Sequence, residues 1–384
     1  MALISFPKSS LLILLALVPS CQGSKRQVRF GDKATFTQMC VRNCLKDYED
    51  YLTEGNKPDP VGQCNINLDL GRGEWDPKAA VYSEAESDKT TPPPGYFDSP
   101  AVLEALQWDC KSLCNYSCFQ SHARRSANEK KIPIKYAEKW PFVRVFGVEE
   151  FMSFLACLLN GLIHIYYLTS NKLRPLFVGP EGYRMKTPMI IYSVVCLNSY
   201  LWSAFYFISS NKRTETMDLF FAFFKSIITT WVTVYRIGGS GAGENAFGNT
   251  CAFISLAALA PFLFIFAFYV YLMTSFTFNP MMSMRLQLAF MGLHVIMWVY
   301  WSLIGRGRGK GYRWKGLACL FFLNLITFIE VVLGWDIDDF PPYFGLFDNK
   351  SIWLLFTVPL TSLWYSFLMN DTKWEVDAME KKKK

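Results

Sequence analysis

Seven apolar segments, each about as long as a helix needs to cross a bilayer, constrain the fold of this 384-residue chain more than any other feature. Hydrophobic residues make up 51% of the chain and aromatic residues 17%, which is too apolar for an ordinary soluble protein. The sequence therefore predicts an all-α membrane domain of seven transmembrane helices within residues 144–370. Short connections join the segments, which lie at about 147–168, 188–208, 217–235, 252–274, 283–304, 316–334 and 351–369.

Two further regions precede the membrane domain. Residues 1–23 resemble a secretory signal, because Lys8 precedes the short apolar run 11–18 and small residues follow at the cleavage positions. The run is short for a spanning helix, and an uncleaved anchor is the alternative. Residues 24–143 are polar, with a proline-rich break at 90–99, and are expected to form a luminal domain.

Of the eleven cysteines, Cys21 lies in the predicted signal and the others divide into two groups. Those at 157, 196, 251 and 319 fall in apolar segments and are expected to be small buried hydrophobes. The second group is the six cysteines of the predicted luminal region. An even number of cysteines in an oxidising lumen predicts disulfides, although six cysteines can pair in fifteen ways. Four-residue steps place several thiols on one helix face and predict two short helices joined by disulfides, with a zinc cluster as the alternative. The six cysteines of the luminal region are Cys40, Cys44, Cys64, Cys110, Cys114 and Cys118.

The charges of the loops predict the orientation. The first and fifth connections between the apolar segments are basic, whereas the sixth carries four aspartates and one lysine. This positive-inside pattern places the N-terminal domain in the lumen and residues 371–384 in the cytosol. The formal net charge of +7 is spread between membrane segments, so no nucleic-acid partner is expected.

Two short signals concern location. Asn115 begins an Asn-Tyr-Ser sequon, which predicts glycosylation and fits a luminal domain. The chain ends in the four lysines 381–384, which resemble a dilysine retrieval signal recognised by a coat protein. A solvated basic tail is the alternative. The expected location is the endoplasmic reticulum membrane, with cycling through the Golgi.

Polar residues inside or beside a membrane are functional candidates because they are costly to place there. On the predicted topology Ser203 and Asp218 lie at the luminal edge, together with the aspartates of the sixth connection. Taken singly, Ser203 can bond its own backbone, Asp218 can cap a helix, and the loop acids can be hydrated. Their shared depth favours a site. Its candidate carboxylates, besides Asp218, are Asp336, Asp339 and Asp348.

Histidines offer that site little. The chain has only three, His122, His164 and His294, and on the predicted topology they share neither a helix nor a depth. A three-histidine zinc site is therefore not expected, and only His294 remains as a partner for Ser203.

Several segments resemble the Per-one-like proteins, the post-GPI-attachment lipid-remodelling phospholipases of the CREST superfamily of membrane hydrolases. The resemblance covers nearly the whole mature chain. It rests on Trp108-Asp109-Cys110 with Cys114 and Cys118, KWPFVRVFGVEE at 139–150, LLNG at 158–161, LNSYLWS at 197–203, Met217-Asp218, and DFPP at 339–342 followed by Asp348 and Ile352-Trp353.

The resemblance implies a phospholipase A2-type hydrolysis of an acyl ester in GPI lipid, at a luminal site built from a serine, an aspartate, histidines and zinc. Ser203 and Asp218 match the serine and the aspartate, and Asp336 falls where the family commonly has a glutamate. The histidine positions do not match. They hold Phe207, Lys350, Leu354 and Thr361, so zinc, the cofactor of the family, is not expected here.

Three hypotheses follow. The first is a diverged hydrolase in which carboxylates replace imidazoles. The second is a noncatalytic homologue, a pseudoenzyme that binds GPI-linked or other membrane lipids or GPI-anchored proteins. The third is a seven-helix receptor, for which the sequence offers no motif. The residues favour a retained fold and pathway over retained chemistry.

Overall fold

The computed structural model is almost entirely helical. It describes residues 35–55, 57, 64, 95–96, 99–128, 140–169, 185–238, 248–275, 280–303, 311, 313–328 and 342–383. Two short strands, β1 (Gly95–Tyr96) and β2 (Arg144–Val145), pair in parallel. The helices are α2 (Thr35–Thr53), α5 (Pro100–Ala105), α6 (Cys110–Asn128), α7 (Phe151–Thr169), α9 (Lys186–Ile208), α10 (Lys212–Gly238), α11 (Gly248–Ser275), α12 (Pro280–Leu303), α13 (Arg313–Phe328) and α15 (Asn349–Lys383).

Three disulfides hold the N-terminal unit together. Cys40–Cys118 and Cys44–Cys114 form two rungs between α2 and α6, and Cys64–Cys110 ties a third segment to the start of α6. The two cysteines of α2 pair with the two of α6 in reverse order along the chain, so the two helices run antiparallel. The prediction of two helices joined by disulfides is confirmed, and the structure supplies the pairing that the sequence left open.

Residues 140–150 connect this unit to the bundle. The Arg144 guanidinium lies over the rings of Trp108 and Tyr116, with Cζ 4.7 and 4.3 Å from their centroids. The Trp108 indole donates to the Gly147 carbonyl at 2.9 Å. Gly147 has φ +74°, and a Cβ there would meet the Leu106 side chain at 2.8 Å. Glycine is therefore required at this turn for both its conformation and the close approach.

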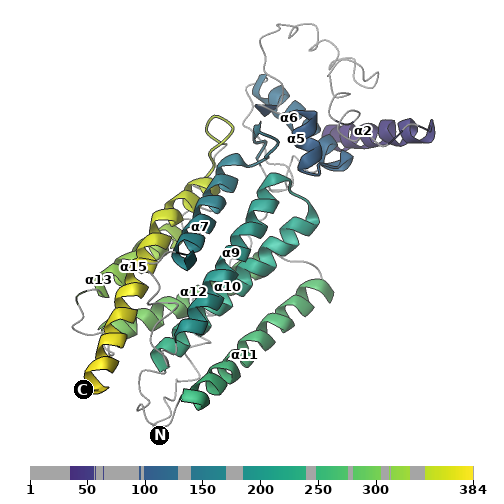
Figure 1. Ribbon diagram of the computed structural model, residues 1–384. Coiled ribbons are helices and arrows are strands. Elements are labelled where there is room, and N and C mark those ends of the chain that lie inside the picture. The colour runs from purple at the N-terminus through teal and green to yellow at the C-terminus, as the bar shows by residue number, and fades with distance from the viewer. Residues whose placement is uncertain are drawn as a thin grey trace.

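The long helices form a closed bundle. Following their contacts, α10, α9, α7, α15, α13 and α12 make a ring in which α12 returns to α10, and α11 packs on the outside against α10. Figure 1 shows the disulfide unit at the end of the bundle where α7 begins, and α15 ending at the opposite end. The loop between α9 and α10 therefore lies at the same end as the disulfide unit.

The described helices support the membrane character and qualify the number of spans. Five are long and apolar enough to cross a bilayer: Phe151–Thr169, Lys186–Ile208, Lys212–Ile237, Met282–Leu303 and Asn349–Trp374. The fourth predicted segment contributes only a shorter apolar stretch, Leu259–Ser275, and α13 has 16 described residues. The expected C-terminal tail is not separate from the last helix, because α15 continues through Lys383. The predicted signal at 1–23 lies outside the described residues.

A buried ion pair holds the end of the bundle opposite the disulfide unit. Arg236 of α10 donates from Nε to Asp371 Oδ2 of α15 at 2.6 Å and from Nη2 to Oδ1 at 3.0 Å. The two side chains are 2% and 4% exposed. This fork geometry satisfies both charges and joins two helices that are distant in sequence.

Candidate functional site

Ser203 and Asp218 meet beside the loop that joins α9 to α10. Ser203 Oγ donates a hydrogen bond to Asp218 Oδ1 at 2.5 Å, and both residues are half-buried. The chain reverses here because Asn211 caps α10, accepting from the backbone N–H groups of Arg213 and Thr214 at 3.0 Å. The structure thus brings together the two residues that sequence reasoning paired. Their catalytic role stays a prediction.

The positions that carry histidine in the resembling family also converge. Phe207 of α9 and Leu354 of α15 share one buried cluster with Ala156 and Cys157 of α7. Lys350 lies one turn before Leu354, and its Nζ is 4.5 Å from the centroid of the Phe207 ring. Two helices distant in sequence therefore place these positions against each other.

Thr361 occupies the remaining position, further along the same face of α15. Its Oγ1 donates to Asn160 Oδ1 at 2.9 Å, and Asn160 Nδ2 donates to Thr357 Oγ1 at 3.0 Å and to the Leu354 carbonyl at 3.3 Å. Asn160 is fully buried and so locks α7 to α15 directly beneath the cluster. Sequence reasoning missed this role, although an asparagine inside the LLNG segment of an apolar helix was a usable signal.

This set of side chains does not fit zinc. Zinc takes imidazole nitrogen, thiolate or carboxylate ligands, whereas these positions present a phenyl ring, an ammonium, an isobutyl group and a hydroxyl already bonded to Asn160. Lys350 also places a positive charge where a dication would lie. The residues present therefore do not match the metal that the resemblance implies.

Neither described histidine side chain repairs the mismatch. His164 Nδ1 bonds the Tyr365 hydroxyl at 2.7 Å, and His294 Nδ1 bonds Thr233 Oγ1 at the same distance. Both imidazoles are buried and already have partners. The sequence left His294 as the one histidine partner for Ser203. In the structure, His294 bonds Thr233 of α10, and Ser203 donates to Asp218 instead.

Charged groups of both signs surround the buried Cys157 thiol. It interacts electrostatically with Asp218, Lys225, Lys350 and Glu150. The Lys225 ammonium lies 4.6 Å from the ring centroid of Tyr200, one turn below Ser203 on α9. Two cations and two carboxylates thus contribute to the electrostatic environment of this thiol.

Asp348 caps a helix, and its membership of a site stays a prediction. Its Oδ1 accepts the Ser351 backbone N–H at 2.8 Å, while Ser351 Oγ accepts the Asp348 N–H at 3.0 Å. This reciprocal pair caps the start of α15. Burial, with a further contribution from the Glu150 charge, raises the pKa of the Asp348 carboxyl above its ordinary value. Asp336 and Asp339 lie outside the described residues.

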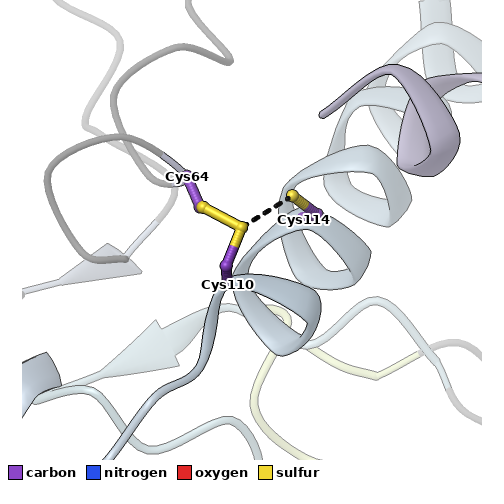
Figure 2. A group of neighbouring side chains, drawn as sticks. All are labelled: Cys64, Cys110 and Cys114. Atoms are coloured by element: carbon purple, nitrogen blue, oxygen red, sulfur yellow. Dashed lines mark hydrogen bonds between the residues drawn. A yellow bond between two sulfur atoms is a disulfide. The ribbon is translucent and has the colours of Figure 1, made fainter. Parts of the chain in front are cut away.

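The sulfur atoms of Cys64, Cys110 and Cys114 form the only metal-compatible grouping among the described histidine, cysteine and acidic side chains. Figure 2 shows the Cys64–Cys110 disulfide, with the Cys114 sulfur 3.7 Å from that of Cys110. Cys114 is itself bonded to Cys44. None of the three is a thiolate, so the alternative of a zinc cluster in this unit is not supported.

Comparison with known proteins agrees with the resemblance. The model of the Per1-like family matches residues 100–372, well over half of the chain. A Xenopus tropicalis protein named "GPI-specific phospholipase A2-like PGAP3" is 27% identical over 277 residues, covering 72% of this chain and 81% of that protein. No solved structure shows significant similarity.

Two further relatives show similar levels of identity. The Schizosaccharomyces pombe "Protein PER1 homolog" is 25% identical over 284 residues, covering 72% of this chain and 79% of its own length. The Drosophila melanogaster "Post-GPI attachment to proteins factor 3" is 24% identical over 355 residues, covering 92% and 91%.

Proposed function

Because the chain belongs to the Per1-like family of GPI lipid-remodelling membrane proteins, we propose that it engages GPI lipid at the Ser203–Asp218 site without the metal-dependent hydrolysis of that family. One observation carries the proposal. The family's histidine positions converge beside Ser203 and Asp218, yet they are filled by a packed phenyl, ammonium and isobutyl group. On this proposal, the chain keeps the framework of the site and has other side chains in place of its metal ligands.

The Ser203–Asp218 pair alone is a poor replacement for the missing groups. A serine nucleophile needs a base that takes its proton, and in serine–histidine–aspartate sites the imidazole does so while the aspartate orients it. Here the aspartate bonds the serine directly. A carboxylate is ordinarily a weaker base than an imidazole, so attack by Ser203 on an ester is expected to be slow.

Acyl release from a GPI-lipid substrate by the purified protein in detergent tests this proposal. The protein is expected to release no more fatty acid than its Ser203→Ala variant, with or without added zinc. Robust metal-dependent release that Ser203→Ala or Asp218→Ala abolishes would overturn it. That result would instead support the second candidate, a diverged hydrolase, which the direct contact between Ser203 and Asp218 favours.

Lipid binding is the positive half of the proposal. Native mass spectrometry is expected to find GPI lipid retained in preference to phosphatidylcholine, and Ser203→Ala, which removes the hydroxyl of the proposed site, is expected to retain less of it. The matched variant Asn160→Leu disturbs the helix contact beneath the site and is expected to weaken retention. Equal retention of both lipids by the unaltered protein would contradict selective engagement.

We extend the proposal to topology and location. Seven spans would place the disulfide unit and the end of α15 on opposite sides of an endoplasmic reticulum or Golgi membrane, with the disulfides in the lumen. Glycosidase-sensitive modification at Asn115, a half-buried position on α6, is the expected sign of a luminal N-terminal unit. Replacing Lys381 and Lys382 by serine should release the protein to later compartments, and unchanged location would exclude coat-protein retrieval through them.

A further inference from the structure

Two turns at the disulfide end of the bundle share one unusual backbone. Phe146-Gly147 has φ values of +51° and +74°, and Phe344-Gly345 has φ values of +55° and +69°. Glycine adopts this region freely, whereas a phenylalanine there is strained because its Cβ crowds the following carbonyl oxygen. A strained aromatic residue in the same place in two separate turns is a reason to ask what the two phenylalanines contact.

The two turns lie side by side and are each closed by hydrogen bonds. Val145 and Val148 exchange backbone bonds of 3.0 Å around the first, and Tyr343 and Phe347 bond each other at 2.8 and 3.1 Å around the second. The Val143 N–H then donates to the Gly345 carbonyl at 2.9 Å. The backbones are so close that a Cβ on Gly345 would lie 2.6 Å from the Val143 side chain. The pair forms one rigid tip.

This tip, formed by residues 143–148 and 342–347, presents aromatic side chains outward. Phe344 is 88% exposed, Tyr343 65% and Phe146 51%. Moving phenylalanine rings out of water is favourable, so a set of exposed rings in two adjoining turns indicates a contact surface. Residues 342–347 carry no charge, and Arg144, the one charged residue of the other turn, is buried. The surface is therefore suited to an apolar or interfacial environment.

The position of the tip indicates that membrane lipid covers its exposed rings. Phe146 precedes α7 by five residues, and Phe344 precedes α15 by five residues, so both turns lie where spanning helices begin. The outer faces of these helices are apolar and exposed, with Leu158 and Leu162 on α7 and Phe356 on α15. Aromatic rings are favoured at that depth, where hydrocarbon meets headgroups. The exposed rings continue a surface that already faces lipid.

We propose that the paired Phe-Gly turns insert Phe344, with Tyr343 and Phe146, into the membrane leaflet on the side of the disulfide unit. The tip also reaches the candidate site. The N–H of Glu150, just after the first turn, donates to the Phe207 carbonyl at 3.0 Å, and Lys350, just after the second, lies over the Phe207 ring. Insertion thereby fixes the depth of the end of α9, which carries Ser203, at the layer where lipid ester groups lie.

A spin label attached to Phe344→Cys, in the full-length protein reconstituted in bilayers, measures whether the tip lies in lipid or in water. Collision with oxygen reports lipid exposure, and collision with a water-soluble nickel chelate reports aqueous exposure. Two labelled variants calibrate the scale: Phe264→Cys on the exposed face of α11, and Asn211→Cys in the exposed α9–α10 loop at the same end. The label at 344 is expected to favour oxygen over nickel, as at 264.

Nickel access equal to that at 211 would overturn the proposal, because the tip would then be in water. Protection from both reagents would also overturn it, because protein would then cover the tip. Phe344→Cys keeps a non-glycine residue at the strained φ, so it adds no new backbone conformation, and Tyr343→Cys provides a second reading. Cys157, Cys196 and Cys319 are buried, and the unsubstituted protein supplies the labelling background. The inference does not depend on the proposed function, since insertion is measured without any assay of the site.

Discussion

Each end of the helix bundle holds an aspartate on a long helix, and the two are used differently. Asp371 is 4% exposed and is held by two hydrogen bonds from Arg236, so its charge is neutralised inside the protein. Asp218 is half-buried and accepts a hydrogen bond from a neutral serine. The first arrangement is suited only to holding helices together. The second leaves a carboxylate and a hydroxyl at the disulfide end of the bundle, beside the positions at which the resemblance predicts histidines.

The largest effect is expected at the Arg236–Asp371 pair. Arg236→Ala leaves a buried carboxylate uncompensated and should lower the free energy of unfolding by about 3–5 kcal/mol. The double variant Arg236→Met/Asp371→Leu removes both charges and should recover most of this loss. Thermal unfolding in detergent compares them. If the double variant is no more stable than Arg236→Ala, the uncompensated charge of Asp371 is not the cause of the stability loss.

A smaller effect is expected at Asn160, between the two ends. Asn160→Leu removes three hydrogen bonds to α15 and should lower the free energy of unfolding by about 1–2 kcal/mol. The matched variant Thr361→Val removes only one of these bonds and should lose less. An equal loss in both would mean that Thr361, rather than Asn160, holds the contact.

Asp348 should show an effect of about 1 kcal/mol with a defined pH dependence. Asp348→Ala removes the cap of α15. Because the folded-state pKa of Asp348 is raised, its protonated form stabilises the fold at low pH, and that contribution is lost as the pH rises through the raised value. Asp348→Asn keeps a capping side chain without titrating, so its melting temperature should fall less between the ordinary aspartate pKa and neutrality. Parallel profiles would contradict the raised pKa.

The smallest effect is expected at Ser203. Ser203→Ala leaves Asp218 with access to water and should change the free energy of unfolding by only about 0.5 kcal/mol. A loss as large as that of Arg236→Ala would mean that the Ser203–Asp218 pair is structural, and the contrast between the two ends would disappear.

Much of this architecture follows from the sequence because apolar runs and cysteine spacing are local signals. A described helix overlaps each of the seven apolar segments, the sixth as far as Phe328, and the two-helix disulfide unit follows from four-residue steps. The pairing of Cys40 with Cys118 could not be predicted, since it depends on the antiparallel docking of α2 and α6. The five described helices that satisfy length and composition also leave the full set of seven spans as a proposal.

The candidate site was predictable as a set of residues but not as an arrangement. Ser203 and Asp218 follow from motif position, yet only the fold shows the Lys350 ammonium on the Phe207 ring. Asp348 was expected to belong to a site because its loop is acidic. That expectation stays untested, whereas the cap that Asp348 forms has its own signal, the Asp-x-x-Ser pattern immediately before an apolar run, because a reciprocal cap needs those residues at that spacing.

Zinc content of the purified protein tests the central claim most directly. A reference variant introduces histidine at the three positions that meet in the buried cluster, with Phe207→His, Lys350→His and Leu354→His. The account predicts that this variant binds about one zinc ion per chain, since histidine ligands on converging positions suit a tetrahedral site, whereas the unaltered protein binds well below that level. Stoichiometric zinc in the unaltered protein would contradict the claim that the metal ligands of the family site have been lost.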